Sequence, residues 1–252
     1  MVAGKRQQLK TFVEVIQVSW VQIPSGPFLP FQKVEILALL FIGMKRKALY
    51  SRNNLYFIAG VFFLILEAIV IFVNLDAGRP MVLFWFCNHI PLFLSFAFFS
   101  RNTALVKAFI SVGLIAQALW TIDFIGKVFF DTFVFGYSKY VFGIQGFELF
   151  VPIIIHMFSI AIAFLATLRE KTDKRVLLYA FVYLVVLQAI TLAITLPEDN
   201  INCVQKICGF ESINLPHYSF IWSILVFLIL VLPAYLLQVL IYNKLYKKSN
   251  AR

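Results

Sequence analysis

The chain has 252 residues, of which 62% are apolar and only 13% charged, and its formal net charge is +10 at pH 7. Soluble domains usually carry about a quarter of charged residues, so this composition excludes an ordinary water-soluble domain. The positive charge does not indicate nucleic-acid binding, because the Lys and Arg residues flank apolar runs instead of forming a basic patch. We therefore expect a multi-pass protein of the cell membrane whose partners are membrane lipids, with no nucleic acid.

Six apolar segments are long enough to cross a bilayer, which takes about 20 helical residues for ~30 Å of hydrocarbon. In chain order they are 55–75, 81–99, 105–125, 147–168, 176–196 and 219–242. The sequence thus predicts an all-α, six-span bundle over residues 55–242, between an N-terminal cytoplasmic or interfacial segment, 1–54, and a basic cytoplasmic tail, 243–252. Within the first segment, residues 34–44 are interpreted as a short interfacial helix, with a tilted seventh span as the alternative.

The placement of positive charge predicts the orientation of these spans. With the N-terminus inside, the 22 Lys and Arg residues divide into 18 in the inner segments and 4 in the outer loops. Cytoplasmic loops carry an excess of Lys and Arg, so both termini are expected in the cytoplasm.

A layer of polar residues is predicted inside the membrane. Five spans each place one polar side chain eight or nine residues from the outer end of the span, which is ~12–14 Å deep at 1.5 Å per residue. These residues are Glu67, His89, Gln117, His156 and Gln188. Polar groups are costly in hydrocarbon and therefore face the interior of a bundle. We expect the five to surround a single site, together with the adjacent Asn88 and the shallower Trp120 and Asp123.

The two histidines at matched depth beside Glu67 are candidates for proton transfer. A metal site of Glu67, His89 and His156 has acceptable ligand types, but no ligand spacing supports it, so neither a metal nor a cofactor is predicted. For Gln117 and Gln188 the competing interpretation is a hydrogen bond that only holds helices together.

Two outer loops have a distinct composition. Residues 128–142 include seven aromatic residues and are expected at the headgroup level, as an aromatic belt or as a lid over the site. The last outer loop, 197–218, contains Cys203 and Cys208, which could form a disulfide in an oxidising compartment.

The second predicted span contains the sequence Phe-Cys-Asn-His-Ile-Pro-Leu at residues 86–92. A basic turn follows at Arg101 and Asn102, the third span ends near Trp120, and a single histidine, His156, lies in the fourth span. This layout resembles the androgen-induced-protein-like membrane enzymes and related bacterial integral membrane proteins. The resemblance implies a six-helix intramembrane lipid hydrolase or acyltransferase that uses a Thr or Cys nucleophile with a histidine. On this chain it implies Cys87 as the nucleophile and His156 as the base; a buried free cysteine that only fills space is the alternative for Cys87.

Three functions are compatible with the polar layer. In a lipid acyl hydrolase or acyltransferase, His156 or His89 would act as the general base, and Asn88 or Gln117 would stabilise an oxyanion. A proton-coupled transporter of a small solute would use the same layer as its binding site, although no inverted repeat is visible. In a non-catalytic subunit or assembly factor, the layer would only hold the helices together. The oligomeric state is not predicted.

Overall fold

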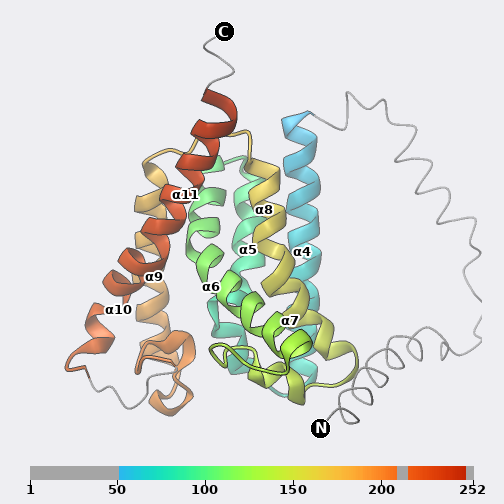
Figure 1. Cartoon of the computed structure of the whole chain (residues 1–252), viewed down its shortest axis with the longest axis vertical. Helices are drawn as coiled ribbons and strands as arrows, with labels where there is room; N and C mark the ends of the chain where they lie inside the picture. Colours follow the sequence, from blue (N-terminus) through green and yellow to red (C-terminus); the bar gives the residue numbers. More distant parts are fainter. Residues whose placement is uncertain (1–50, 209–214, 248–252) are drawn as a thin grey trace, which may run out of the picture. The chain divides into compact units, whose positions relative to one another are not determined.

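The computed structural model describes residues 51–208 and 215–247 (Figure 1). The expected interfacial helix at 34–44, most of the N-terminal segment and the end of the basic tail lie outside the described residues. Within the described ranges all regular structure is helical, in agreement with the predicted fold class.

The long helices run up and down beside one another (Figure 1). The α-helices are α4 (Arg52–Asp76), α5 (Phe86–Phe99), α6 (Thr103–Phe130), α7 (Phe150–Ile154), α8 (Ile160–Thr167), α9 (Arg175–Ile194), α10 (Tyr218–Val226) and α11 (Leu232–Tyr242). Short 3-10 turns are η1 (Pro80–Phe84), η2 (Lys139–Gly143), η3 (Gly146–Leu149), η5 (Pro197–Asp199) and η6 (Ile201–Cys203). Turns of π-helix are η4 (Ile155–Ser159), η7 (Phe227–Val231) and η8 (Asn243–Lys247).

Five of these helical stretches are long and apolar enough to cross a membrane. They are Arg52–Asp76, Thr103–Phe130, Gly146–Thr167, Arg175–Ile194 and Tyr218–Leu245. The expected span at 81–99 differs, because α5 has only 14 residues and rises ~21 Å at 1.5 Å per residue. The 3-10 turn η1 precedes it, and the two are separated at Trp85, whose extended backbone (φ −63°, ψ 129°) interrupts the helix.

Helix α6 occupies the middle of the bundle and contacts α5, α8, α9 and α11, while α4 packs along α5. Gly113 permits the close approach of α6 and α8, since a Cβ atom there would lie 2.8 Å from the Ile160 side chain. The core between these helices is apolar and aromatic; for example, the Phe63 and Phe98 rings stack at a centroid distance of 5.6 Å.

Two membrane-length stretches contain π-turns near prolines, namely η4 after Pro152 and η7 before Pro233. Proline removes a backbone donor, and π-turns commonly accommodate such interruptions. The stretch Gly146–Thr167 is therefore irregular where it carries His156.

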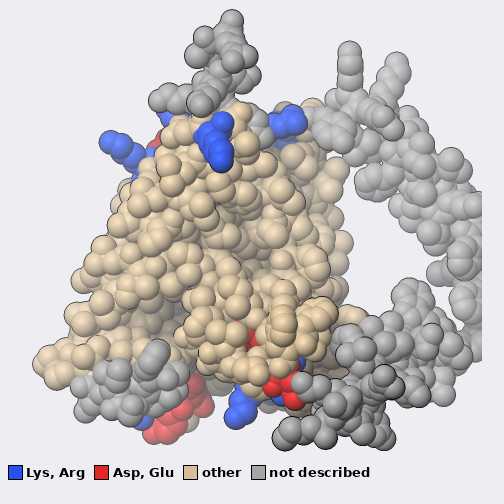
Figure 2. Space-filling model, viewed as in Figure 1, with Lys and Arg blue, Asp and Glu red and all other residues tan. Residues whose placement is uncertain are grey.

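Figure 2 shows a broad uncharged band between two charged ends of the visible face. One end carries the start of α4, the α5–α6 and α8–α9 connections and η8. There the buried Lys107 Nζ donates to the Glu170 carbonyl (2.6 Å) and to the Thr172 hydroxyl (3.0 Å), which ties α6 to the α8–α9 loop. The opposite end carries the loops that surround the site described next.

Candidate functional site: a cavity at the break before α5

A cavity of about 650 Å³ lies at the end of the bundle where α4 finishes and α5 begins. Its volume is within the range of pockets that hold small molecules. Most of its wall is apolar and includes Val73, Val82, Phe86, Val112, Ala116, Leu119, Val151, Leu184, Leu187, Trp222, Val226 and Leu230. The polar or reactive side chains that line it are Asn74, Arg79, Cys87, Asn88, Gln117, Trp120, Tyr137, Tyr140, Glu148, His156 and Asn202.

The break between η1 and α5 forms one side of this cavity and is bridged by a residue more than a hundred positions away. The Asn202 side chain accepts a hydrogen bond from the Phe86 N–H (2.7 Å) and donates to the Phe84 carbonyl (2.8 Å) and to the Thr191 hydroxyl (3.2 Å). Buried backbone groups must be paired, above all where no water reaches them. Asn202 therefore replaces the hydrogen bonds that a continuous helix would have made.

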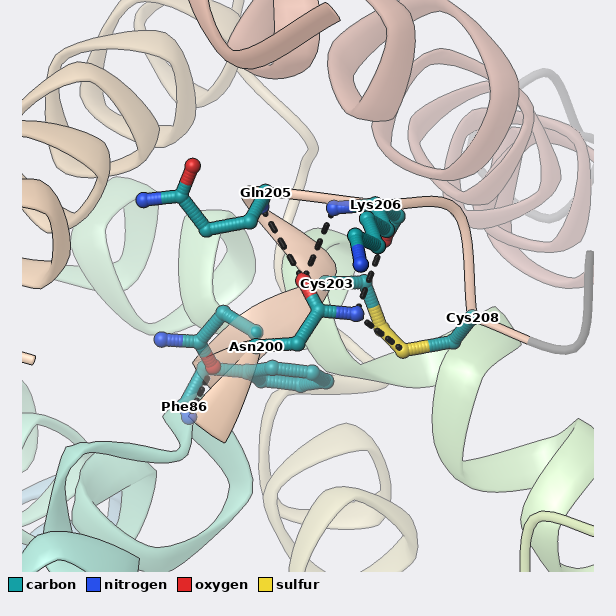
Figure 3. Close-up of a disulfide and its surroundings, with 7 residues drawn as sticks. Phe86, Asn200, Cys203, Gln205, Lys206 and Cys208 are labelled. Atoms are coloured by element: carbon teal, nitrogen blue, oxygen red, sulfur yellow. Dashed lines mark hydrogen bonds between the residues drawn. A yellow bond between two sulfur atoms is a disulfide. The ribbon is translucent and has the colours of Figure 1, made fainter. Parts of the chain in front are cut away.

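Asn202 belongs to a compact loop, and Figure 3 shows the disulfide of this loop and its surroundings. Cys203 and Cys208 form a disulfide, which settles the pairing that the sequence left open. Within this loop the Asn200 side chain accepts from the backbone N–H groups of Gln205 and Lys206 and donates to the Lys206 carbonyl (Figure 3). The loop thus presents Asn202 to the helix break as a fixed group.

The side chains of Asn88 and His89 also form hydrogen bonds with backbone groups at the break. Asn88 donates to the Val82 carbonyl (2.7 Å), and Nδ1 of His89 donates to the Leu83 carbonyl (3.1 Å). The second nitrogen of His89 lies 2.7 Å from the Tyr183 hydroxyl, so both ring nitrogens are engaged. His89 does not line the cavity. The expected grouping of His89 with His156 around one cavity is therefore not present, because the break turns the His89 ring toward α9.

His156 does line the cavity. Its Nδ1 lies 2.7 Å from the Pro152 carbonyl oxygen, which can only accept, so Nδ1 carries a proton. In the neutral ring Nε2 then has a free lone pair, and no residue of the described ranges makes a hydrogen bond to it. The ring stacks on Trp120 at a centroid distance of 4.3 Å, which fixes its plane. The stack continues through Phe124 to Phe142 of η2, in the aromatic loop.

Buried donors without partners face the same space. Gln117 is 3% exposed; its carbonyl accepts from the Ser159 hydroxyl (3.2 Å), but its amide nitrogen has no partner. The Trp120 N–H lies near the Tyr140 hydroxyl without meeting the geometry of a hydrogen bond. Tyr140 lies outside the spans and is 52% exposed as a residue, but desolvation of its hydroxyl end beside the cavity raises the pKa of the phenol, which stays protonated at neutral pH. Unpaired buried donors are rare, so the Gln117 amide and the Trp120 N–H are suited to donate hydrogen bonds to an acceptor atom of a ligand.

Cys87, the second residue of α5, lines the cavity as a buried free thiol. No hydrogen bond joins its sulfur to either imidazole within the described ranges. Its position beside the break, next to Phe86, was not predictable from the sequence, which reads through residues 81–99 as one continuous span.

Three other predicted site residues do not line the cavity. Glu67, a residue of α4, is buried against the Leu92 backbone of α5, and its Oε2 atom has no hydrogen-bond partner in the described residues. Asp123 accepts four hydrogen bonds of 2.7–2.9 Å from Phe135, Gly136 and Ser138, and so anchors the aromatic loop instead of facing a substrate. Gln188 donates to the Ser219 carbonyl and links α9 to α10. Matched depth had grouped Glu67 and Gln188 with the cavity residues, and Asp123 was expected just above them, but none of the three lines the cavity.

Across residues 51–208 and 215–247, no three His, Cys, Asp or Glu side chains are grouped so that they could hold a metal ion. The sequence reasoning also missed the ion pair between Arg79 and Glu148 at the cavity (2.6 Å) and the bridging role of Asn202. Only the polar composition of the last outer loop, 197–218, hinted at the role of Asn202. Both roles depend on contacts between residues that are distant in the sequence.

Comparison of the chain with known protein families, with curated proteins and with solved structures finds no match. The helical architecture and the cavity are therefore the grounds for any functional conclusion.

Proposed function

We propose that the chain is a multi-pass membrane protein with six crossings, in which η1 and α5 together make the second, broken crossing, and that both termini face the cytoplasm of a cell membrane. The charge asymmetry supports this orientation, since among residues 51–208 and 215–247 the cavity-bearing end holds only Arg79, Lys127, Lys139 and Lys206 as positive residues. Reporter fusions after Lys171 and after Lys247 should then report cytoplasm, and one after Glu198 should report the outer side. Opposite results at two of these three sites would refute the topology.

For the cavity we propose a lipid acyl hydrolase or acyltransferase. One observation carries this proposal: a free thiol, an imidazole with an available Nε2 and an unpartnered amide donor, from Cys87, His156 and Gln117, line one apolar cavity. A nucleophile, a base and an oxyanion donor are the three groups that acyl transfer needs. The apolar wall suits an acyl chain entering from the bilayer.

In this proposal the Cys87 sulfur attacks the carbonyl carbon of a lipid ester, and its proton passes to Nε2 of His156. The oxyanion accepts a hydrogen bond from the Gln117 amide. When the tetrahedral intermediate collapses, the ester C–O bond breaks and the leaving alkoxide takes the proton from His156. Water or a second alcohol then attacks the Cys87 thioester, with His156 again as base, which releases a fatty acid or a new ester and restores the thiol.

A second candidate is a non-covalent carrier or receptor for an amphiphile. The broken crossing at Trp85 favours it, because helices interrupted beside a buried site are typical of transporters. The two candidates differ in one respect: only the enzyme forms a bond between the lipid and Cys87.

The test uses a lipid with an electrophilic acyl group, incubated with purified full-length protein, followed by mass analysis. We expect a covalent acyl adduct on Cys87 that is absent in Cys87→Ser protein. His156→Asn is the sharpest variant, because its amide nitrogen still donates to the Pro152 carbonyl while Nε2 is removed. Acylation should then fall about 10²–10⁴-fold, the usual cost of losing a general base. An adduct that forms equally well in His156→Asn, or a lipid that binds without any adduct, would refute the enzyme and leave the carrier.

A further inference from the structure

The cavity contains a second polar feature, the ion pair between Arg79 and Glu148. Arg79 follows α4 and Glu148 lies in η3; their charged atoms are 2.6 Å apart, and both residues line the cavity. Their side chains are 40% and 41% exposed, so the pair lies where the cavity meets its surroundings. The other ion pairs of the described residues, such as Lys127 with Asp131, do not line the cavity.

Both members of the pair have unused hydrogen-bonding capacity. The Arg79 Nε atom is buried and has no partner, and only one of the terminal nitrogens is bonded to Glu148. On Glu148, the bond from Arg79 reaches Oε2, and no residue of the described ranges bonds to Oε1. A guanidinium with free N–H groups suits a phosphate, and a carboxylate oxygen suits an ammonium group.

The two opposite charges select among lipid headgroups. A purely anionic headgroup would gain from Arg79 but would be repelled by Glu148, only a few ångströms away. A zwitterionic headgroup pairs its phosphate with Arg79 and its ammonium with Glu148, so that neither charge is left unpaired. Tyr137 and Tyr140, which also line the cavity, provide aromatic faces that favour a cation nearby.

The ion pair is also connected to the reactive groups. Glu148 and His156 lie on the same stretch, Gly146–Thr167, eight residues and ~12 Å apart along a helix. A lipid held by its headgroup at Glu148 would thus extend inward past Pro152 toward His156 and Cys87. We propose that Arg79 and Glu148 form the headgroup subsite of the cavity and that its ligand is a phospholipid with a zwitterionic, ammonium-bearing phosphate headgroup. This inference rests on the proposed lipid-binding function of the same cavity.

The test is a competition assay on full-length Cys87→Ser protein in detergent, which binds lipid without turnover. The probe is a phosphatidylethanolamine with a fluorophore on its acyl chain, and the competitors are phosphatidylethanolamine and phosphatidylglycerol with identical chains. We expect the zwitterionic lipid to compete about tenfold better or more, the size of effect typical of one charge-assisted contact. Soluble glycerophosphoethanolamine, tested as a separate competitor, distinguishes an intact lipid from a free headgroup as the ligand. If it displaced the probe as well as phosphatidylethanolamine does at the same concentration, the assignment of a lipid as the ligand would be overturned.

Three variants test the assignment of each charge. Glu148→Gln should remove the preference between the two lipids, because the ammonium partner is lost while the phosphate partner remains. Exchanging the pair, Arg79→Glu with Glu148→Arg, keeps an ion pair for folding but reverses the charges, and should weaken probe binding about tenfold or more. Lys127→Gln, at the pair outside the cavity, is the matched control and should bind as the parent does.

Equal competition by both lipids, or an exchanged variant that binds like the parent, would overturn the headgroup subsite. These results would leave the Cys87 labelling experiment unaffected, so the two proposals fail separately. Conversely, a clear headgroup preference in a protein that forms no acyl adduct would retain the subsite and remove only the enzyme.

Discussion

The most decisive structural prediction concerns Asn202→Ala. In the wild-type protein this side chain pairs the Phe86 N–H and the Phe84 carbonyl on the two sides of the Trp85 break. Alanine removes both partners without altering the break itself, since the extended conformation of Trp85 belongs to the backbone of the η1–α5 connection. The variant is therefore left with one unpaired backbone donor and one unpaired backbone acceptor at the break, and the Thr191 hydroxyl also loses its bond from Asn202.

The size of the effect follows from the two backbone groups left unpaired. A buried polar group without a partner costs about 1–3 kcal/mol, so the two groups should destabilise the fold by about 2–6 kcal/mol, and water in the cavity would bring the loss toward the lower value. In a chain of this length that loss corresponds to a fall in Tm of roughly 4–24 °C. The thiol of Cys87, one residue beyond Phe86, should become more reactive toward a maleimide because the start of α5 is loosened.

Asn74→Ala is the matched control. Asn74 is also a buried asparagine at the cavity, but its side chain donates to the Val70 carbonyl within α4, which is already in the regular helical hydrogen-bond pattern. Removing it leaves no backbone group unpaired, so its Tm should change by a few degrees at most. Thermal unfolding in detergent and the rate of maleimide labelling measure both variants. If Asn202→Ala matched Asn74→Ala in both measurements, the bridging role of Asn202 would be wrong.

Three further predictions follow from packing, burial and charge. The pKa of the Tyr140 phenol is raised in the folded state, so this residue costs stability as the pH rises past the pKa that the phenol has in the unfolded chain. Tyr140→Phe should therefore reduce the loss of stability above pH 10, which a series of Tm measurements from pH 8 to 11 would show. Gly113→Ala should destabilise by about 1–3 kcal/mol, because the new methyl group would lie 2.8 Å from Ile160, whereas Gly143→Ala has open space and should be neutral in the same unfolding assay. Lys107→Met should cost about 1–3 kcal/mol by leaving a loop carbonyl without its donor, and unchanged stability would show that water replaces the amine.

The sequence alone determined the helical class and most of the helix positions. Five of the six predicted spans correspond to helical stretches of membrane length, because about 20 consecutive apolar residues have few other stable arrangements. The sequence also determined that polar groups would lie inside the bundle, and His156 and Gln117 indeed line one cavity.

Only the tertiary structure decided which polar groups share the site. Depth along a helix can be counted from the sequence, but the neighbour that a side chain faces depends on how the helices are rotated and where they are broken. His89 shows this: the break at Trp85 directs its ring to Tyr183 and to the Leu83 carbonyl. Asp123 likewise satisfies loop N–H groups that no helical pattern reveals.

The break itself depends on a long-range partner. Residues 81–99 are apolar enough to form a continuous helix, and an interruption is tolerated because Asn202 pairs the freed backbone groups. Asn202 is distant in the sequence and is positioned by the loop that the Cys203–Cys208 disulfide closes. Local propensity sets the helices of this protein, whereas the site forms where hydrogen bonds between distant segments outweigh that propensity.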